Sequence, residues 1–202
     1  MPSTPNFAIP YPALSDSPNG PSQMQAMATQ IDTVMPMRQV SSTAAVTSPY
    51  EGQFIYNSTD NLIYRRTGSV WVPTIQHLVA LASSDLTIPV TTDTDIAGAT
   101  ITVTTQVANA VARVAADYDW DCTVTGTGYC YGNLYVDGTR QAGEAIFVAQ
   151  SAETRIPGSK HWTIILATAG SHTLKLRGRK DSSSGTGIFR AAGTSILIDL
   201  YQ

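Results

Sequence analysis

Apolar and polar residues alternate along the C-terminal part of the chain, most regularly between residues 112 and 125. The even positions there carry Ala, Val, Ala, Tyr, Trp, Cys and Val, whereas the odd positions carry Arg, Ala, three Asp and two Thr. A period of two is typical of a strand with one buried face and one solvated face. The pattern therefore predicts a strand over Ala112–Thr125.

Shorter runs of the same kind continue through residues 84 to 202, separated by turn residues. The strongest turn signal is Asp137-Gly138, which suits a two-residue hairpin. Together these runs predict an antiparallel β-sandwich of the jelly-roll type. The further strands are expected at Leu86–Thr91, Thr100–Gln106, Tyr129–Val136, Gly143–Ala149, Trp162–Ala167, His172–Arg179, Gly187–Ala191 and Thr194–Tyr201.

Two of these predicted strands, in residues 131–136 and 196–201, are apolar on both faces. One face can enter the core of the sandwich. The other face is rich in tyrosine and leucine, which is typical of a subunit interface. We therefore expect the head to be trimeric. The second faces carry Tyr131, Tyr135, Leu197 and Tyr201.

The first 21 residues contain six of the eleven prolines. Proline fixes φ and lacks an amide donor, so the segment is expected to be extended and outside the centre of any sheet. Its spaced apolar residues suit an arm that lies across another protein. The predicted virion-docking residues are Phe7, Ile9, Tyr11 and Leu14. A disordered tail is the alternative.

A short helix is predicted from about Pro21 to Met35. Ser22 and Gln25 fit a capping box, and Pro36 ends the helix. Apolar residues at spacings of three and four form one stripe, as in the seam of a short coiled coil. A trimer seam is one hypothesis, and packing on the chain's own β head is the other. The seam residues would be Met24, Met27, Ile31 and Met35.

Residues 39–49 are rich in Ser and Thr and are predicted to form a linker. A three-stranded meander follows, and it is too small to bury its large apolar side chains alone, which again favours an oligomer. Its strands are expected at Gln53–Tyr56, Leu62–Arg66 and Val70–Val72. The predicted domains are the arm and helix (1–38), the linker and meander neck (39–80) and the jelly-roll head (81–202).

The meander carries the first resemblance to a known family. Its residues resemble the small meander of phage tail-fibre and minor tail proteins, where a G…Y…T-x-N-x-L-Y…G…W run recurs. The opening segment, residues 6–35, resembles the N-terminus of minor tail proteins from phages of actinobacteria. Together the two resemblances cover about residues 5 to 73 and imply a virion protein. The matching meander residues are Gly52, Tyr56, Asp60, Asn61, Leu62, Tyr64, Gly68 and Trp71.

The head carries a less specific resemblance. The patterns YVDGT, AGSHTLKLRGR and TSILIDLY, within residues 135–139, 169–179 and 194–201, resemble the trimeric jelly rolls of the tumour-necrosis-factor type. Such jelly rolls also cap many phage fibres. The resemblance implies a trimeric head over residues 84–202.

Charged residues make up 13% of the chain, about half the usual share of roughly 25%. The net charge is −3 without any basic block, which argues against nucleic-acid binding. No apolar run approaches the ~20 residues that a spanning helix needs, so membrane insertion is not expected. The N-terminus lacks the pattern of a signal peptide, so we expect the chain to stay in a cytoplasm or to leave it without a secretory signal.

Candidate chemistry is sparse. Asp117, Asp119 and Asp121 do not fit a calcium loop, because Cys122 and Gly128 stand where glycine and glutamate are needed. A solvated strand face is the favoured interpretation of these aspartates. No nucleophile elbow supports a catalytic triad, and the three histidines have no metal-ligand spacing. We therefore expect neither an enzyme nor a cofactor.

Three smaller features leave alternatives open. Cys122 and Cys130 would face each other in a hairpin centred on Gly126, as two buried reduced cysteines or as a pair. His172 falls at an apolar position and is expected to be a satisfied core or interface histidine. A basic patch on one strand face is either solvated or contacts an anionic polymer or a neighbouring subunit. The patch contains Lys175, Arg177 and Arg179, next to Lys180 and Arg190.

The sequence predicts a homotrimeric phage tail fibre or minor tail protein, found in the virion and assembled in the host bacterial cytoplasm. Its partners would be its own copies, other tail or capsid proteins and a host surface glycan. A capsid head fibre or decoration protein is the alternative, and a carbohydrate-binding module outside a virion is weaker. Receptor contact is expected in the loops 137–143 and 181–187, at Arg140, Gln141, Asp181 and Ser183.

Overall fold

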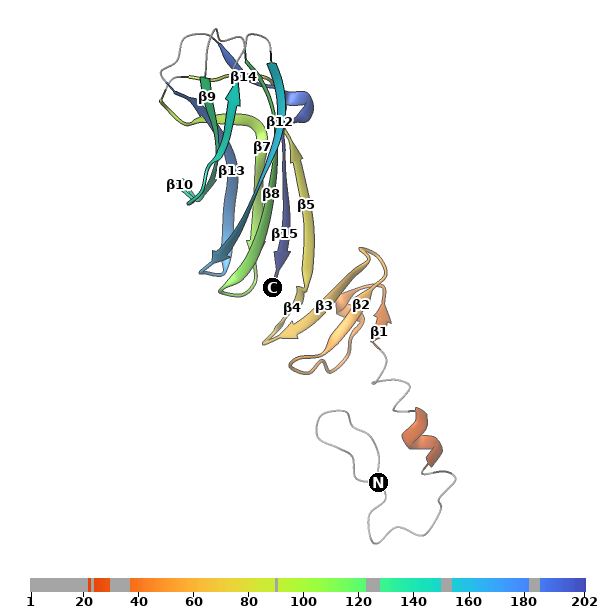
Figure 1. Cartoon of the computed structure of the whole chain (residues 1–202). Coiled ribbons are helices and arrows are strands. Elements are labelled where there is room, and N and C mark those ends of the chain that lie inside the picture. Colours follow the sequence, from red (N-terminus) through yellow and green to blue (C-terminus); the bar gives the residue numbers. More distant parts are fainter. Residues whose placement is uncertain are drawn as a thin grey trace. The chain divides into compact units, whose positions relative to one another are not determined.

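The computed structural model describes residues 22, 24–29, 37–89, 91–122, 128–149, 154–181 and 186–202. The chain divides into two compact units, residues 1–74 and 75–202 (Figure 1). Residues 24–29 are helical, and Met24 and Met27 are exposed there, so the coiled-coil seam stays a prediction. The other predicted docking and seam residues, and one predicted receptor contact, lie outside the described residues: Phe7, Ile9, Tyr11, Leu14, Ile31, Met35 and Ser183.

The N-terminal unit contains a four-stranded sheet. The predicted meander is present as β2 (Phe54–Asn57), β3 (Leu62–Thr67) and β4 (Val70–Pro73). A further strand, β1 (Arg38–Val40), pairs in parallel with β2. The predicted strand boundaries differ from the observed ones by one residue at each of four ends.

The predicted linker over residues 39–49 is wrong. These residues contribute to β1 and form the 3₁₀ helix η1 (Thr43–Ala45). Val40 and Val46 are buried with Ile55, against Tyr64 and Trp71. The segment therefore covers part of the apolar surface of the three-stranded meander. Its Ser- and Thr-rich sequence shows neither the period of a strand nor that of a helix, so the pattern did not predict these elements.

The turn between β2 and β3 is built from the residues that carry the meander resemblance. The Asp60 carboxylate accepts hydrogen bonds from Asn57 Nδ2 at 3.0 Å and from the Tyr64 hydroxyl at 2.6 Å. The Tyr56 hydroxyl donates to Asn61 Oδ1 at 2.7 Å, and Asn61 has a φ of 58°. Burial, together with the hydrogen bond to Asp60, raises the pKa of Tyr64 to about 12. The motif is therefore explained by turn formation.

The C-terminal unit contains eight longer strands whose pairing is nested. In chain order the first pairs with the eighth, the second with the seventh, the third with the sixth and the fourth with the fifth, all antiparallel. This is the arrangement of a jelly roll, so the predicted fold class is confirmed. The strands are β5 (Ile75–Leu81), β7 (Thr94–Thr105), β8 (Ala110–Cys122), β9 (Gly128–Val136), β11 (Ala145–Ala149), β12 (Thr154–Leu166), β13 (Gly170–Lys180) and β15 (Ser195–Tyr201).

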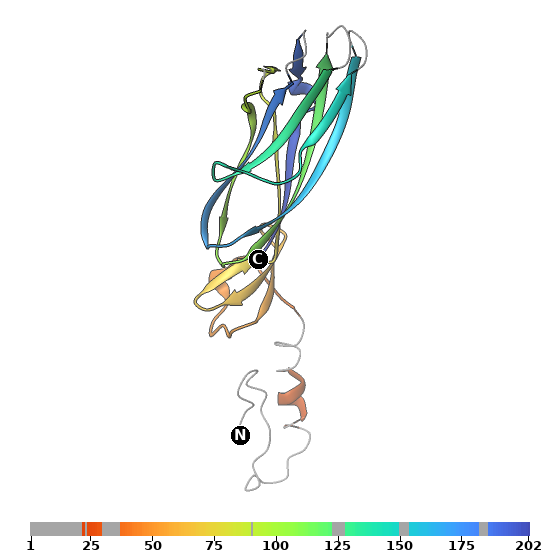
Figure 2. The ribbon, with the colours of Figure 1, turned by 60° about the vertical axis from the view of Figure 1, so that its left-hand side comes forward.

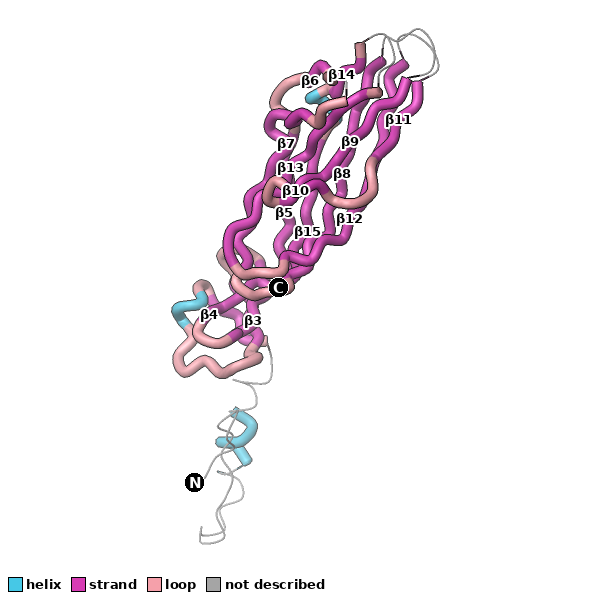
Figure 3. Tube along the Cα trace, turned by 90° about the vertical axis from the view of Figure 1, so that its left-hand side faces the viewer, coloured by secondary structure: helices cyan, strands magenta, loops and turns pink. Residues whose placement is uncertain are grey.

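The eight strands form two sheets that pack face to face. Sheet I has the order β7-β13-β9-β11, and sheet II has the order β5-β15-β8-β12. Figures 2 and 3 show these strands from two further directions. Three short strands extend the sheets: β6 (Leu86–Thr87), β10 (Thr139–Arg140) and β14 (Gly187–Phe189). The 3₁₀ helix η2 (Ala191–Gly193) precedes β15.

Large aromatic side chains fill the space between the two sheets. Tyr118 from sheet II packs against Phe147 and Phe189, with ring centroids 5.4 Å apart in both pairs. Its ring reaches sheet I at Gly132, where an added Cβ would lie 2.4 Å from Tyr118 Cζ. Such close packing makes the core sensitive to volume, and truncating a buried aromatic residue costs about 3–5 kcal/mol.

Sheet II contains two stretches that the sequence pattern missed. β5 was expected in the neck, but it pairs with β15 along its whole length, so the head unit begins at Ile75 and not at residue 81. β12 begins at Thr154, well before the predicted Trp162, and its first half contains Pro157-Gly158. Proline is tolerated there because β12 lies at the edge of sheet II.

The expected hairpin around Gly126 is wrong. β8 belongs to sheet II and β9 to sheet I, so the chain crosses between the sheets after Cys122. In backbone register Cys122 lies opposite Thr154 in sheet II, whereas the buried Cys130 lies opposite Phe147 in sheet I. In this jelly roll the consecutive long strands lie in different sheets except for β9 and β11, and local turn residues alone do not reveal this.

Candidate functional site: the charged outer face of sheet I

The outer face of sheet I, here called the charged face, is set by strand alternation. On β9 and β13, residues such as Leu134 and Leu176 point into the core, so their neighbours point outward. The outward residues are tyrosines, an asparagine and cations that lie side by side in the pairing of β9 with β13. They are Tyr131, Asn133, Tyr135, Lys175, Arg177 and Arg179.

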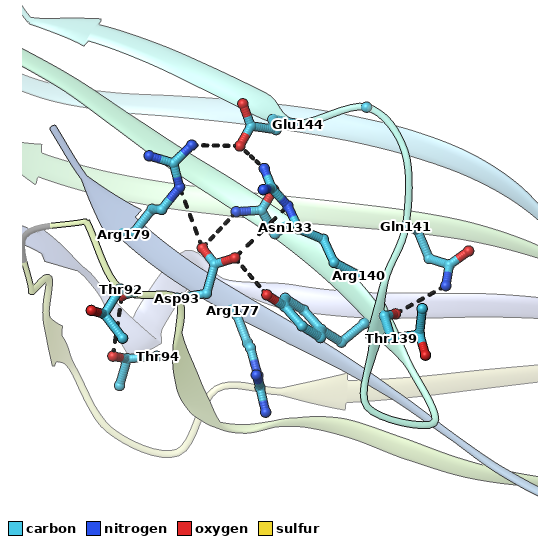
Figure 4. Close-up of polar contacts among 12 residues, drawn as sticks. Thr92, Asp93, Thr94, Asn133, Thr139, Arg140, Gln141, Glu144, Arg177 and Arg179 are labelled. Atoms are coloured by element: carbon cyan, nitrogen blue, oxygen red, sulfur yellow. Dashed lines mark hydrogen bonds and ion pairs between the residues drawn. The ribbon is translucent and has the colours of Figure 1, made fainter.

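Asp93 lies at the centre of this face (Figure 4). Its carboxylate accepts hydrogen bonds from Asn133 Nδ2 at 2.8 Å and from the Tyr135 hydroxyl at 2.6 Å. Arg179 Nε lies 3.6 Å and Arg140 Nε 3.8 Å from its oxygens. The side chain is only 10% exposed, so it is a nearly buried charge with two cations and two neutral donors around it.

Arg140 is held on several sides by this network. It donates from Nε and Nη2 to Asn133 Oδ1 at 3.1 and 3.0 Å, and it forms an ion pair with Glu144. Glu144 also accepts from Arg179 Nη2 at 2.7 Å, so it bridges the two arginines (Figure 4). Burial and the hydrogen bond to Asp93 raise the pKa of Tyr135. Networks of this kind fix side-chain positions more firmly than isolated surface pairs.

The cations of the predicted basic patch, expected to be solvated or to contact an anionic polymer or a neighbouring subunit, have acidic partners within the chain. Lys175 Nζ and Arg177 Nε bind the Asp95 carboxylate at 2.6 and 2.5 Å. Burial alone would raise the pKa of Asp95, but these two hydrogen bonds and charges lower it. Arg177 also lies over the ring of Tyr135, 4.1 Å from its centroid. Arg179 is 4.0 Å from the centroid of Tyr131. The two tyrosines are therefore partly covered by arginines of their own chain.

A short exposed loop extends from the charged face. Asp137 and Gly138 both have positive φ, 49° and 80°, and form the expected two-residue turn between β9 and β10. Arg140 and Gln141, two of the predicted contact residues, lie together just after this turn, and Gln141 Nε2 donates to Thr139 O at 3.0 Å. The loop residues 137–140 and 142–143 are exposed, whereas Arg140 ties the loop to the network below it.

Asp181, the third described contact residue, lies just after the end of β13. Its backbone amide donates to Tyr129 O at 3.0 Å, and its carboxylate accepts from Tyr129 N at 3.2 Å. The carboxylate is therefore used in part to hold the end of β9. Asp181 therefore lies beside the start of β9, whereas Arg140 and Gln141 follow the end of β9, so the structure brings these last two predicted residues together.

His172 supports the same loop from below. It is buried, with Nδ1 2.7 Å from Asp137 Oδ2 and Nε2 3.0 Å from Thr168 O. Both partners accept hydrogen bonds, so the geometry suits the protonated ring, in which both nitrogens donate. The hydrogen bond to Asp137 raises the pKa of His172. The expectation of a satisfied core histidine is thus confirmed.

The three aspartates of β8 do not form the solvated row that was expected. Asp119 is buried and pairs with Arg155, whose Nε donates to Asp119 Oδ1 at 2.7 Å. The hydrogen bond from Arg155 lowers the pKa of Asp119. Asp121 pairs with Arg190, which also binds Asp85 at 2.8 Å. Only the exposed Asp117 fits the expectation.

Asp117 lies between two open hollows of about 390 and 340 Å³ near η2. The polar groups at the hollows are the Asp117 carboxylate and nearby hydroxyls, and Ser195 Oγ lies 3.4 Å from Asp117 Oδ2. In the described ranges, no three His, Cys, Asp or Glu side chains are grouped to hold a metal ion. No helix in the described part of the chain is long and apolar enough to span a bilayer.

Sequence reasoning missed the residues at the centre of the charged face: Asp93, Asn133 and Glu144. A signal was present for Asn133, because it is a polar residue on the same phase as Tyr131 and Tyr135. Asp93 and Glu144 come from segments outside the long strands, and their convergence depends on the jelly-roll topology. Spacing in the sequence could not reveal it.

Comparison with known proteins adds little beyond the fold. No family model and no curated protein matches the chain. Among solved structures, it is similar to dimeric latent PorU from Porphyromonas gingivalis (9% identity, 68% of this chain and 14% of that chain, TM-score 0.43). It is also similar to a chain of a viral particle of infectious bursal disease virus (11% identity, 70% of this chain and 38% of that chain, TM-score 0.39).

A third similar structure is Eiger TNF from S. frugiperda (11% identity, 64% of this chain and 93% of that chain, TM-score 0.34). The neighbours thus include chains of a viral particle and a TNF-like fold. The chain spans less than two fifths of the PorU and viral chains that it matches. The fold assignment rests on the strand pairing and not on these matches.

Proposed function

We propose that the chain is a structural protein of a phage particle, a tail fibre or minor tail protein. In this proposal residues 1–38 attach the chain to the virion, and the jelly-roll head contacts the host surface as a trimer. The support comes from the resemblance of residues 5–73 to minor tail proteins and from the compact β head. Three heads on one stalk would raise avidity for a repeated receptor without a tight single site.

The observation that carries receptor contact is the anchored loop at residues 137–143. Its turn residues are held by His172, and Arg140 is held by Asn133, Asp93 and Glu144. An exposed loop on a rigid scaffold loses little conformational entropy when it binds. The exposed Thr139 and the half-buried Gln141 offer hydroxyl and amide groups, which suit a polar ligand such as a surface glycan.

The position in the particle can be tested by labelling. Antibodies raised against the full chain should bind the tail or its tip on intact particles. Labelling of the capsid surface would favour the head-fibre or decoration alternative, and unlabelled particles would exclude a role in the virion.

Receptor contact needs a separate test. The purified full chain is added to host cells, and the amount bound is compared between wild type and Gln141→Ala. The matched control is Gln106→Ala, which changes an exposed glutamine in the turn after β7. Weaker binding by the first variant alone supports the loop, whereas equal binding by both variants contradicts it.

A further inference from the structure

The outer face of sheet II, here called the bare face, consists of four rows across β5, β15, β8 and β12. Core residues such as Ile198 and Val114 point inward, so the alternate positions point out. Strand register then places four residues in each row. The rows are Ile75–Tyr201–Val111–Ile165, His77–Asp199–Arg113–Thr163, Val79–Leu197–Ala115–His161 and Leu81–Ser195–Asp117–Ser159.

Large aliphatic side chains on this face are open to solvent. Val79 is 59%, Leu81 67% and Ile165 66% exposed. Solvent-facing strand positions normally carry polar residues, as the charged face does. Val79, Leu197 and Leu81 lie in two adjacent rows and form one apolar group, and the row that ends at Ile165 forms a second group beyond the polar row. Exposed apolar groups of this kind mark an interaction surface.

The polar row between the apolar rows already has partners. His77 Nδ1 lies 2.6 Å from Asp199 Oδ1, and the Arg113 guanidinium lies 5.2 Å from the centroid of the Tyr201 ring. A partner that covers this row would therefore not have to supply a hydrogen bond to this oxygen of Asp199. This lowers the desolvation cost of burying the face.

We propose that the bare face binds a second copy of this chain. The β5 half of one copy would pack against the β12 half of the next, so that three bare faces surround a three-fold axis. This inference rests on the proposed trimeric function and names the surface that holds the head together. It also replaces the tyrosine surface of sheet I as the expected interface, because those tyrosines are partly covered by arginines.

Charge and area favour an identical copy as the occupant. Arg113, Asp117 and Asp199 are the only Arg, Lys, Asp or Glu residues in the sixteen row positions, so two such faces meet with little like-charge repulsion. Strand spacing and rise give the face roughly 20 Å by 20 Å, or about 400 Å² in projection. This is about half the ~800 Å² that each partner buries in a standard interface, which fits the apolar centre of one.

The most exposed aliphatic side chains of the face stand on its two edge strands. Val79 and Leu81 lie on β5, and Ile165 lies on β12. Each edge can therefore offer a different apolar half-surface to a neighbouring copy. A cyclic trimer requires such a contact between two different half-surfaces.

The test is the solution mass of the full chain by light scattering. Wild type is expected to be a trimer, and Val79→Arg and Ile165→Arg should each shift the mass toward one copy at the same concentration. The matched control is Ile146→Arg, because Ile146 is 58% exposed on sheet I and the change in size and charge is the same. The control should remain a trimer.

Other outcomes separate this inference from the proposed function. A trimer that persists in both sheet II variants overturns the interface but leaves a trimeric fibre in place. A monomeric wild type overturns the interface, while antibody labelling still decides whether the chain is part of the virion. A wild-type dimer that Val79→Arg dissociates supports the bare face and contradicts the trimer. Should an arginine variant fail to fold, by circular dichroism, the milder Val79→Thr replaces it.

Discussion

Strand alternation produces both outer faces of the sandwich, but the outward residues differ between the two sheets. On sheet I, arginines of β13 cover the outward tyrosines. Asp93 and Arg140, from outside the long strands, bind the amide of Asn133. On sheet II, aliphatic side chains such as Val79 remain exposed beside a polar row that is paired within itself. A face completed by its own chain holds the fold and its loop in place, whereas a face left open is available to another molecule.

The largest expected difference between the faces follows from Asp93→Ala. This change leaves Arg140 and Arg179 without their shared carboxylate and removes the acceptor for Tyr135 and Asn133. Because the carboxylate is nearly buried, we expect a loss of about 3 kcal/mol in the free energy of unfolding. Denaturant titration measures it, with Asp117→Ala on the bare face as the control. Equal losses in the two variants would contradict a stabilising network.

The pH dependence of stability tests the support of the charged-face loop. The pKa of His172 is raised, chiefly by its hydrogen bond to Asp137, so its contribution is complete below the unfolded pKa of about 6.5 and is lost as pH rises through the folded value. Burial alone would raise the pKa of Asp137, but the hydrogen bonds from His172 and Thr173 lower it. The Asp137 contribution is therefore lost only in acid.

We expect His172→Gln to destabilise the fold by about 1 kcal/mol or more near pH 6, and by less as the pH rises toward 9. Denaturant titrations of both proteins across this range measure the difference. His161→Gln, on the exposed bare face, is the matched control and should keep the wild-type profile. A loss that is constant with pH would indicate that His172 acts through packing alone.

A smaller effect is expected where the core meets the charged sheet. The Tyr118 hydroxyl is buried and has no hydrogen-bond partner among the described residues. Burial, together with the nearby Asp93 charge, raises the pKa of this tyrosine. Tyr118→Phe removes a polar group that gains nothing from burial, so the free energy of unfolding should rise by up to about 1 kcal/mol. A loss of more than 1 kcal/mol in denaturant titration would show that the hydroxyl has a partner.

Much of the head could be predicted from its sequence because strand alternation is a local signal. β8, β9 and β15 lie close to their expected ranges, and the Asp137-Gly138 turn is present. β5 was missed because its residues gave no turn signal separating it from the meander. The start of β12 was also missed. Its Pro157-Gly158 pair is compatible with an edge strand, and only the strand pairing reveals that β12 lies at an edge.

The candidate site was less predictable than the strands. Arg140 was selected because it lies in a loop, but its partners Asp93 and Asn133 are 47 and 7 residues away along the chain. Their approach depends on which strands share a sheet. The bare face was predicted in part, because Leu197 and Tyr201 were recognised in the sequence as a second apolar face. The contribution of β5 and β12 to this face could be identified only from their register with the inner strands.

The smallest intrinsic effect is expected on the bare face, and its dependence on concentration is informative. Val79→Thr replaces an exposed side chain by one of similar shape, so in the dissociated chain the free energy of unfolding should change by less than about 0.5 kcal/mol. If copies bind through this face, assembly adds stability that rises with protein concentration. The melting temperature of wild type should then increase with concentration more steeply than that of Val79→Thr. The loss caused by Asp93→Ala should not depend on concentration, because its partners belong to the same chain. Parallel slopes for wild type and Val79→Thr would show that the bare face does not associate.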